Sequence, residues 1–207
     1  MSGMTTRKVD PRLDRLVKCA ETAGASEARI IDVREIVVDR RVRLKCAVPL
    51  CDSYGSHLMC PPAVMPVDEF ELALRRYRCA IILQVETDHA SADKPGRRLT
   101  RDTCDEREEA TRTRDWKIKL HEIVNCVEAA AFKEGFYLAA GLIGGTCSLC
   151  VECVGQQSGE PCRHPFEARP SMEAMGIDVL RTCGNVGMTV RFSSEDRVRW
   201  TGLVLID

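Results

Sequence analysis

Four cysteines within sixteen residues constrain this chain more than any other feature of its sequence. They lie in the segment "CSLCVECVGQQSGEPCRHP", which spans residues 147–165, and they are Cys147, Cys150, Cys153 and Cys162. Chance clustering or simple packing does not account for so many thiols in so short a segment. We therefore expect a loop whose structure depends on metal ligation.

The cellular compartment decides how clustered thiols are used. The N-terminal segment "MSGMTTRKVDPRLDRL" lacks the apolar stretch of a signal peptide, and the longest apolar segment, around residues 136–143, is too short and too rich in glycine to span a bilayer. We therefore expect a cytoplasmic protein. In a reducing cytosol, twelve cysteines in 207 residues indicate metal binding or redox chemistry rather than structural disulfides.

The spacing of the cysteines favours an iron-sulfur cluster. Cys147, Cys150 and Cys153 form a C-x2-C-x2-C run, by which bacterial-type ferredoxins supply three thiolates to one [4Fe-4S] cluster. A structural zinc site, the competing interpretation, usually takes four ligands from two separated pairs. Cys162 is the natural fourth thiolate, although the fourth cysteine of such a run can also ligate a second cluster.

A second group of three cysteines precedes this run, in "CAVPLCDSYGSHLMCPP": Cys46, Cys51 and Cys60. Three thiolates can hold a [4Fe-4S] cluster with one iron open, or they can recruit a fourth ligand. Cys183 is the first candidate for that ligand, and His57 and His164 are weaker candidates, because a lone histidine more often has a structural role. The alternative is that these three cysteines are small hydrophobic residues at a strand end and in a loop.

The other cysteines are isolated within helix or strand patterns, where free cysteine is commonly buried and inert. They are Cys19, Cys79, Cys104 and Cys126. We do not expect them to bind metal.

Apolar periodicity predicts interleaved helices and strands along the whole chain. We expect one domain, 1–207, with two cysteine-rich metal-binding loops at 46–62 and 145–165. We expect helices over 11–23, 67–77, 116–134 and 170–183, and strands over 30–33, 41–46, 79–86, 136–143, 188–192 and 202–207. The polar segment 87–103 is expected to be an exposed, mobile loop. The fold class is therefore α/β or α+β, with a single central sheet and flanking helices.

Charge and motifs exclude several classes of function. The chain has 30 basic and 31 acidic residues, so no global positive field attracts nucleic acid or an anionic membrane. It has no G-x-S-x-G, P-loop or H-E-x-x-H motif, and nothing in the sequence pairs Glu173 with Asp178 as acid and base. A homodimer would be common at this size.

The two cysteine motifs, together with Tyr54, Gly55, Pro66 and the later segment "RPSMEAMGIDV", resemble a family of predicted metal-binding proteins of unknown function from anaerobic bacteria and archaea. Some of its members accompany corrinoid-dependent methyl-transfer systems. The resemblance implies the ligand set Cys46, Cys51, Cys60, Cys147, Cys150, Cys153 and Cys162.

The residues and the resemblance together give one main functional expectation and two alternatives. We expect an iron-sulfur protein with one or two [4Fe-4S] clusters, which transfers electrons to a redox partner protein or activates it reductively in anaerobic metabolism. The first alternative is an enzyme that uses the open iron of a three-cysteine cluster as a Lewis acid. The second is a zinc-stabilised adaptor.

Overall fold

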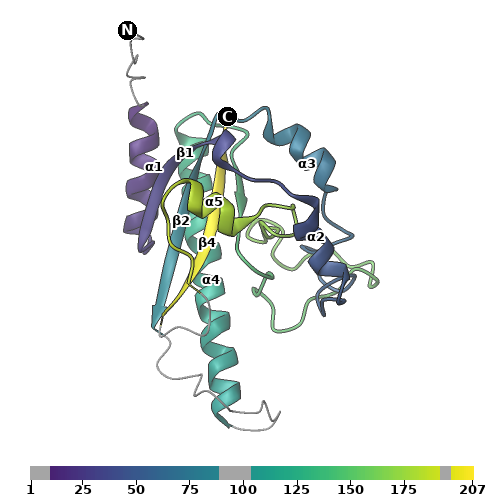
Figure 1. Cartoon of the computed structure of the whole chain (residues 1–207). Helices are drawn as coiled ribbons and strands as arrows, with labels where there is room; N and C mark the ends of the chain where they lie inside the picture. The colour runs from purple at the N-terminus through teal and green to yellow at the C-terminus, as the bar shows by residue number, and fades with distance from the viewer. Residues whose placement is uncertain (1–9, 89–103, 192–196) are drawn as a thin grey trace.

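A four-stranded antiparallel sheet is the centre of the computed structural model, which describes residues 10–88, 104–191 and 197–207 (Figure 1). The strand order is β1-β2-β4-β3, with β1 at Glu27–Asp32, β2 at Cys79–Asp88, β4 at Arg197–Ile206 and β3 at Ala140–Leu142. All three strand pairs are antiparallel. The prediction of a single sheet with flanking helices is therefore confirmed, and the class is α+β.

Strand β2 is buried on both faces. Ile81, Ile82 and Leu83 are each fully inaccessible, although consecutive side chains of a strand point to opposite faces. Ile81 and Leu83 belong to one core cluster and Ile82 to the other. The continuous apolar run "CAIILQV" is explained by this double burial, because each face of the strand is covered by its own layer.

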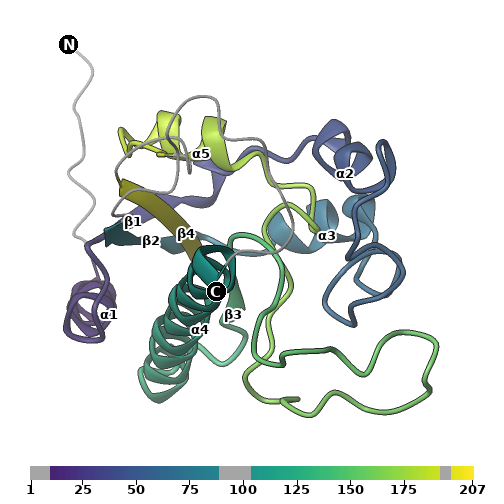
Figure 2. The same ribbon diagram turned by 90° about the horizontal axis from the view of Figure 1, so that it is seen from below.

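Two long helices cover one face of the sheet. Helix α1 spans Pro11–Thr22 and helix α4 spans Cys104–Lys133, and both lie on the same side of the strands in Figure 2. Asp10 caps α1 by accepting a hydrogen bond from the backbone N–H of Arg12 at 3.0 Å. Leu16 of α1 and Ile123 of α4 are fully buried in the shared core.

Shorter elements cover the other face. They are the 3-10 turn η1 at Val33–Glu35 and the helices α3 at Val67–Leu74 and α5 at Val179–Asn185, while helix α2 at Arg40–Ala47 buries none of its residues. Phe70 of α3 and Cys183 of α5 belong to the second core cluster, with Met172 and Ile177 from the turn between β3 and α5. In Figure 2, α2, α3 and the long segments that carry the seven motif cysteines extend to one side of this sandwich.

The strand predicted over 41–46 is wrong, because these residues form helix α2. Asp39 caps the helix by accepting from the backbone N–H of Arg41 at 2.9 Å. None of the residues of α2 is buried. Because no side chain of α2 packs into a core, the alternation of charged and apolar residues in this segment does not indicate a half-buried strand.

The helix predicted over 170–183 is present only in its second half. A single turn over 171–177 precedes α5, and Gly176 ends this turn with a backbone φ of 84°. The strand predicted over 188–192 is absent from its described part, 188–191. There Met188 is buried, and the backbone carbonyl of Thr189 accepts a hydrogen bond from Gln84 at 3.1 Å, so the alternation reflects a loop packed on the core.

Only the first two residues of the loop predicted over 87–103 can be compared with the structure. Thr87 and Asp88 belong to β2, and residues 89–103 lie outside the described part of the chain. Among the described helices, none has both the length and the apolar character that crossing a membrane requires.

Candidate metal centre

The segment that carries Cys147 to Cys162, here called the second cysteine loop (residues 145–165), leaves the sheet and returns to it at one place. The backbone N–H of Ile143 donates to the carbonyl of Pro170 at 3.1 Å, and Met172 N–H donates back to Ile143 at 2.7 Å. Gly144 follows directly, and a Cβ on it would lie 2.6 Å from the backbone oxygen of Thr201. Only glycine fits this exit from the sheet.

Glu128 of α4 fastens both ends of the same loop. Its Oε2 accepts from the backbone N–H of Gly141 at 2.6 Å, just before the loop, and from Nε of Arg169 at 2.9 Å, just after it. Nη2 of Arg169 completes a two-pronged ion pair with Oε1 at 2.9 Å. The side chains of this pair are only 25% and 16% exposed, which makes the ion pair stronger than one on the open surface.

The four cysteines of the second loop share one small cavity. It has a volume of about 20 Å³, and its lining includes Cys147, Cys150, Cys153, Cys162, His57 and His164. The backbone N–H of His164 donates to the sulfur of Cys162 at 3.4 Å. The structure therefore brings together the four thiols of the run, and it adds the two histidines that the sequence ranked as weaker candidates.

The first cysteine loop (residues 46–62) begins in the last turn of α2. The backbone N–H of Cys51 donates to the carbonyl of Cys46 at 3.0 Å, and Cys60 N–H donates to the carbonyl of His57 at 3.0 Å. Gly55 N–H reaches the carbonyl of Pro61 at 2.8 Å. These turns fold the loop back on itself, with Cys60 buried and Cys51 exposed.

Gln156 joins the two cysteine loops. Its side-chain amide donates to the carbonyls of His57 at 2.6 Å, Cys60 at 3.1 Å and Pro61 at 3.3 Å. Its backbone N–H donates to the carbonyl of Ser56 at 3.1 Å. Sequence reasoning missed this residue, because a single glutamine in a polar loop carries no pattern.

Cys60 lies where the two groups of cysteines meet. Burial is the first cause that raises its pKa, to about 12, and the nearby thiols of Cys51, Cys46, Cys147 and Cys153 raise it further. Burial also raises the pKa of Cys147, while the backbone N–H of Leu149 opposes this rise. Both thiols are therefore protonated near neutral pH unless a bound cation stabilises the thiolate.

A lysine and a glutamate border both loops. Oε2 of Glu173 accepts from the backbone N–H of Gly145 at 3.2 Å, and Nζ of Lys117 lies 5.1 Å from the ring centre of Trp200. Burial raises the pKa of Glu173 and lowers the pKa of Lys117. The charge of Lys117 also lowers the pKa of His57, after the larger effect of burial. The sequence analysis did not single out Lys117, and it considered Glu173 only as a possible partner of Asp178, not as a neighbour of the cysteine loops.

Cys183 is separate from this assembly. It is fully buried in the core, where the amide of Gln84 lies 3.9 Å from its sulfur and the hydroxyl of Thr201 lies 4.0 Å away. The residues whose charges or hydrogen bonds shift its pKa include no cysteine. Its position gives no support to a role as an eighth ligand.

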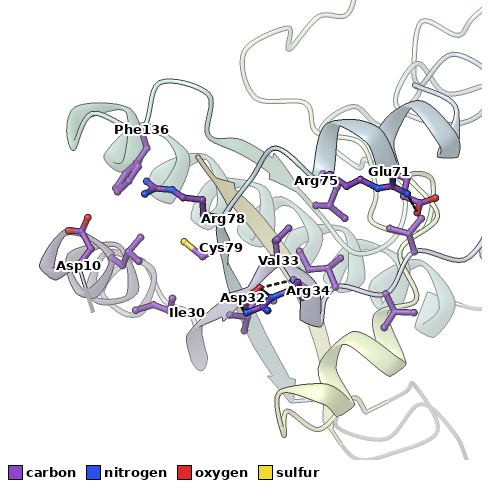
Figure 3. A pocket seen from close by; sticks show the side chains of 16 residues that line it. Asp10, Ile30, Asp32, Val33, Arg34, Glu71, Arg75, Arg78, Cys79 and Phe136 are labelled. Carbon is purple, nitrogen blue, oxygen red and sulfur yellow. Dashed lines mark hydrogen bonds and ion pairs between the residues drawn. The ribbon is translucent and has the colours of Figure 1, made fainter. Parts of the chain in front are cut away.

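A cavity larger than the one that the cysteines share lies elsewhere in the described part of the chain. This open groove of about 1140 Å³ lies at the end of the sheet where β1 finishes and β2 begins, and its lining includes Asp32, Arg78, Cys79 and Phe136 (Figure 3). None of the seven motif cysteines lines it. Volume alone would therefore point away from the cysteines, and the chemistry of the side chains is the better guide to the site.

The seven predicted ligands thus come from two loops in contact, although within the described residues no three Cys, His, Asp or Glu side chains are gathered tightly enough to hold a metal ion. No curated protein and no solved structure matches the chain significantly. A protein family does match it, and the match extends over residues 29–206, which include both cysteine loops and the whole sheet except its first two residues. The chain therefore belongs to the family described as "Predicted metal-binding protein (DUF2284)".

Proposed function

We propose that this protein binds one or two [4Fe-4S] clusters through its two cysteine loops and transfers electrons to a partner protein. The observation that carries the proposal is the cavity that Cys147, Cys150, Cys153 and Cys162 share. The first three of these cysteines have the C-x2-C-x2-C spacing of cluster-binding ferredoxins, and Cys162 follows eight residues later. Membership of a family described as predicted metal-binding proteins supports a metal cofactor in general. The cluster type and the electron transfer are our inference.

The donor set fits an iron-sulfur cluster. Four free thiols face one cavity in the second loop, and three more lie in the adjoining first loop. Cysteine thiolates are the usual ligands of such clusters, and a bound cluster would supply one-electron transfer. Since the thiols are not gathered around one point within the described residues, and the cavity that four of them share has a volume of only about 20 Å³, the loops have to rearrange on binding.

The surrounding residues would tune the centre. N–H groups aimed at ligand sulfurs stabilise the thiolate form, and His164 supplies one of them to Cys162. Gln156 keeps the two groups of thiols adjacent. Cys51 is exposed, so this end of the assembly is open to a partner.

The partner that we propose is a redox protein of the cytoplasm, and the family resemblance favours one that serves corrinoid-dependent methyl transfer. Such a partner would accept electrons at the exposed edge formed by the two loops. The formal net charge of −1 gives no reason to expect nucleic acid at that edge.

Lys117 and Glu173 favour the second candidate function, an enzyme. They lie beside the three-cysteine group, where Glu173 is close enough to raise the pKa of Cys46, after the larger effects of burial and Cys51. A substrate bound there would meet a lysine that can hold an anion and a glutamate that can carry a proton. A zinc-stabilised adaptor remains the third candidate, since four thiols also suit zinc.

Voltammetry of anaerobically purified protein tests the first proposal. We expect a reversible low-potential couple that Cys150→Ser weakens or removes, while the matched variant Cys79→Ser leaves it intact, because Cys79 lies outside both motifs. A protein that is redox-silent with its native metal bound would refute electron transfer. Spectral changes on adding small carboxylates, lost in Lys117→Met, would favour the enzyme instead.

A further inference from the structure

Two cysteines outside the metal motifs face each other between the two long helices. Cys19 of α1 and Cys126 of α4 are 107 positions apart in the chain, yet their sulfur atoms are 3.2 Å apart. A disulfide bond is about 2 Å long, so a displacement of about 1 Å would join the two atoms. The sequence placed each of these residues alone in a helical pattern and gave no reason to pair them.

The surrounding contacts hold the two sulfurs in register. Arg15 of α1 forms a two-pronged ion pair with Glu134, just beyond α4, at 2.7 and 2.6 Å. Arg12 donates to the carbonyl of Glu134 at 3.1 Å and lies over the ring of Phe136 at 4.2 Å. With Leu16 packed in the common core, α1 has little freedom to slide along α4.

The pair is at the rim of the core rather than inside it. Cys126 is exposed and Cys19 is half-buried against the apolar cluster. Burial, and then Cys126 itself, raise the pKa of Cys19 to about 11. An oxidant therefore meets Cys126 first, and Cys19 is placed to attack it second.

From this geometry we propose that Cys19 and Cys126 are a modification site, where oxidation by a hydroperoxide forms a reversible disulfide that links α1 to α4. The site is independent of the proposed metal centre, because neither cysteine belongs to the cluster motifs. The disulfide would fasten the outer helix to the one that carries Glu128, the anchor of the second cysteine loop.

The chemistry balances in two steps. The thiolate of Cys126 attacks one oxygen of the hydroperoxide, the O–O bond breaks, and Cys126 becomes a sulfenic acid while an alcohol leaves, or water if the oxidant is hydrogen peroxide. The sulfur of Cys19 then attacks the sulfur of Cys126, the S–O bond breaks, and the hydroxide departs as water with the proton of Cys19. Two thiols are oxidised to one disulfide, and one hydroperoxide is reduced.

Peptide mapping tests the proposal on the full chain with its native metal. Trypsin places Cys19 alone in peptide 19–29 and Cys126 alone in peptide 120–133. After brief treatment with hydrogen peroxide and alkylation of free thiols, we expect most chains to yield these two peptides cross-linked. Dithiothreitol should release them. The mapping reads these two cysteines directly, so a loss of metal from the other cysteines does not disturb it.

Variants separate the pair from general oxidation. Cys126→Ser should abolish the cross-link and leave Cys19 reduced, whereas Cys79→Ser should cross-link as the native chain does. The oxidised native protein should also melt at a higher temperature than the reduced one, with no such difference in Cys126→Ser. Recovery of both peptides singly alkylated, or Cys126 joined to a cysteine other than Cys19, would overturn the proposal.

Discussion

Replacing Gln156 by leucine tests whether the two cysteine loops form one assembly. The substitution keeps the approximate size of the side chain and removes the amide that reaches the carbonyls of His57, Cys60 and Pro61. The backbone hydrogen bond from Gln156 to Ser56 is unaffected. The perturbation is therefore confined to the link between the loops.

The structure gives the size of the effect. One amide group has two N–H donors for three carbonyls, so two hydrogen bonds are lost, each with a net contribution of about 1 kcal/mol. Because Gln156 is only half-buried, water recovers part of this loss. We expect the free energy of unfolding to fall by about 1–2 kcal/mol, which lowers the urea midpoint by roughly 0.5–1 M.

The matched control is Gln157→Leu, since Gln157 is the exposed neighbour of Gln156. Surface changes of this kind alter stability by no more than about 0.5 kcal/mol. Both variants should be compared with the native protein, prepared without oxygen, by urea unfolding and by the rate of metal release to a chelator. Equal midpoints and equal release rates for the two variants would refute the link between the loops.

Three further substitutions test the anchoring of the second cysteine loop. Glu128→Gln should lower the free energy of unfolding by about 1–3 kcal/mol in urea titrations and speed metal release, because the half-buried charge that holds Arg169 is lost. Unchanged release would contradict this role. Gly144→Ala should destabilise by about 1–3 kcal/mol, since the new Cβ meets the Thr201 backbone, whereas Gly184→Ala, with open space around it, should not. Burial raises the pKa of Glu173 in the folded protein, so the free energy of unfolding should fall as pH rises above the normal glutamate range. Urea titrations from pH 5 to 8 should show a smaller fall in Glu173→Gln than in the native protein. An equal fall in both proteins would be inconsistent with burial of the carboxyl.

The sequence predicted best those elements that are buried. Strand β2 and helix α4 carry apolar patterns that burial requires, as Ile82 and Ile123 illustrate with no exposed surface. Helix α2 was predicted as a strand because nothing in it is buried. In a segment whose side chains do not pack into a core, the pattern of apolar residues does not distinguish a helix from a strand.

The composition of the candidate site could also be predicted, but its assembly could not. Thiol chemistry and spacing mark the cysteines of the two loops as candidate ligands, since both are local properties of the sequence, and the family resemblance implies the full set of seven. The contact of the loops depends on Gln156, and the thiol pair of Cys19 and Cys126 depends on how α1 lies along α4. Such contacts between distant segments follow from tertiary packing, which one sequence does not encode in any local pattern.

Iron, zinc and acid-labile sulfide per chain, measured on protein purified without oxygen, test the proposed metal centre most directly. A cluster held by the second cysteine loop predicts about four irons with equal sulfide, and clusters in both loops predict about eight. The absorption spectrum should show sulfide-to-iron bands that Cys150→Ser diminishes. Stoichiometric zinc without sulfide would contradict an iron-sulfur protein and leave a zinc-stabilised fold in its place.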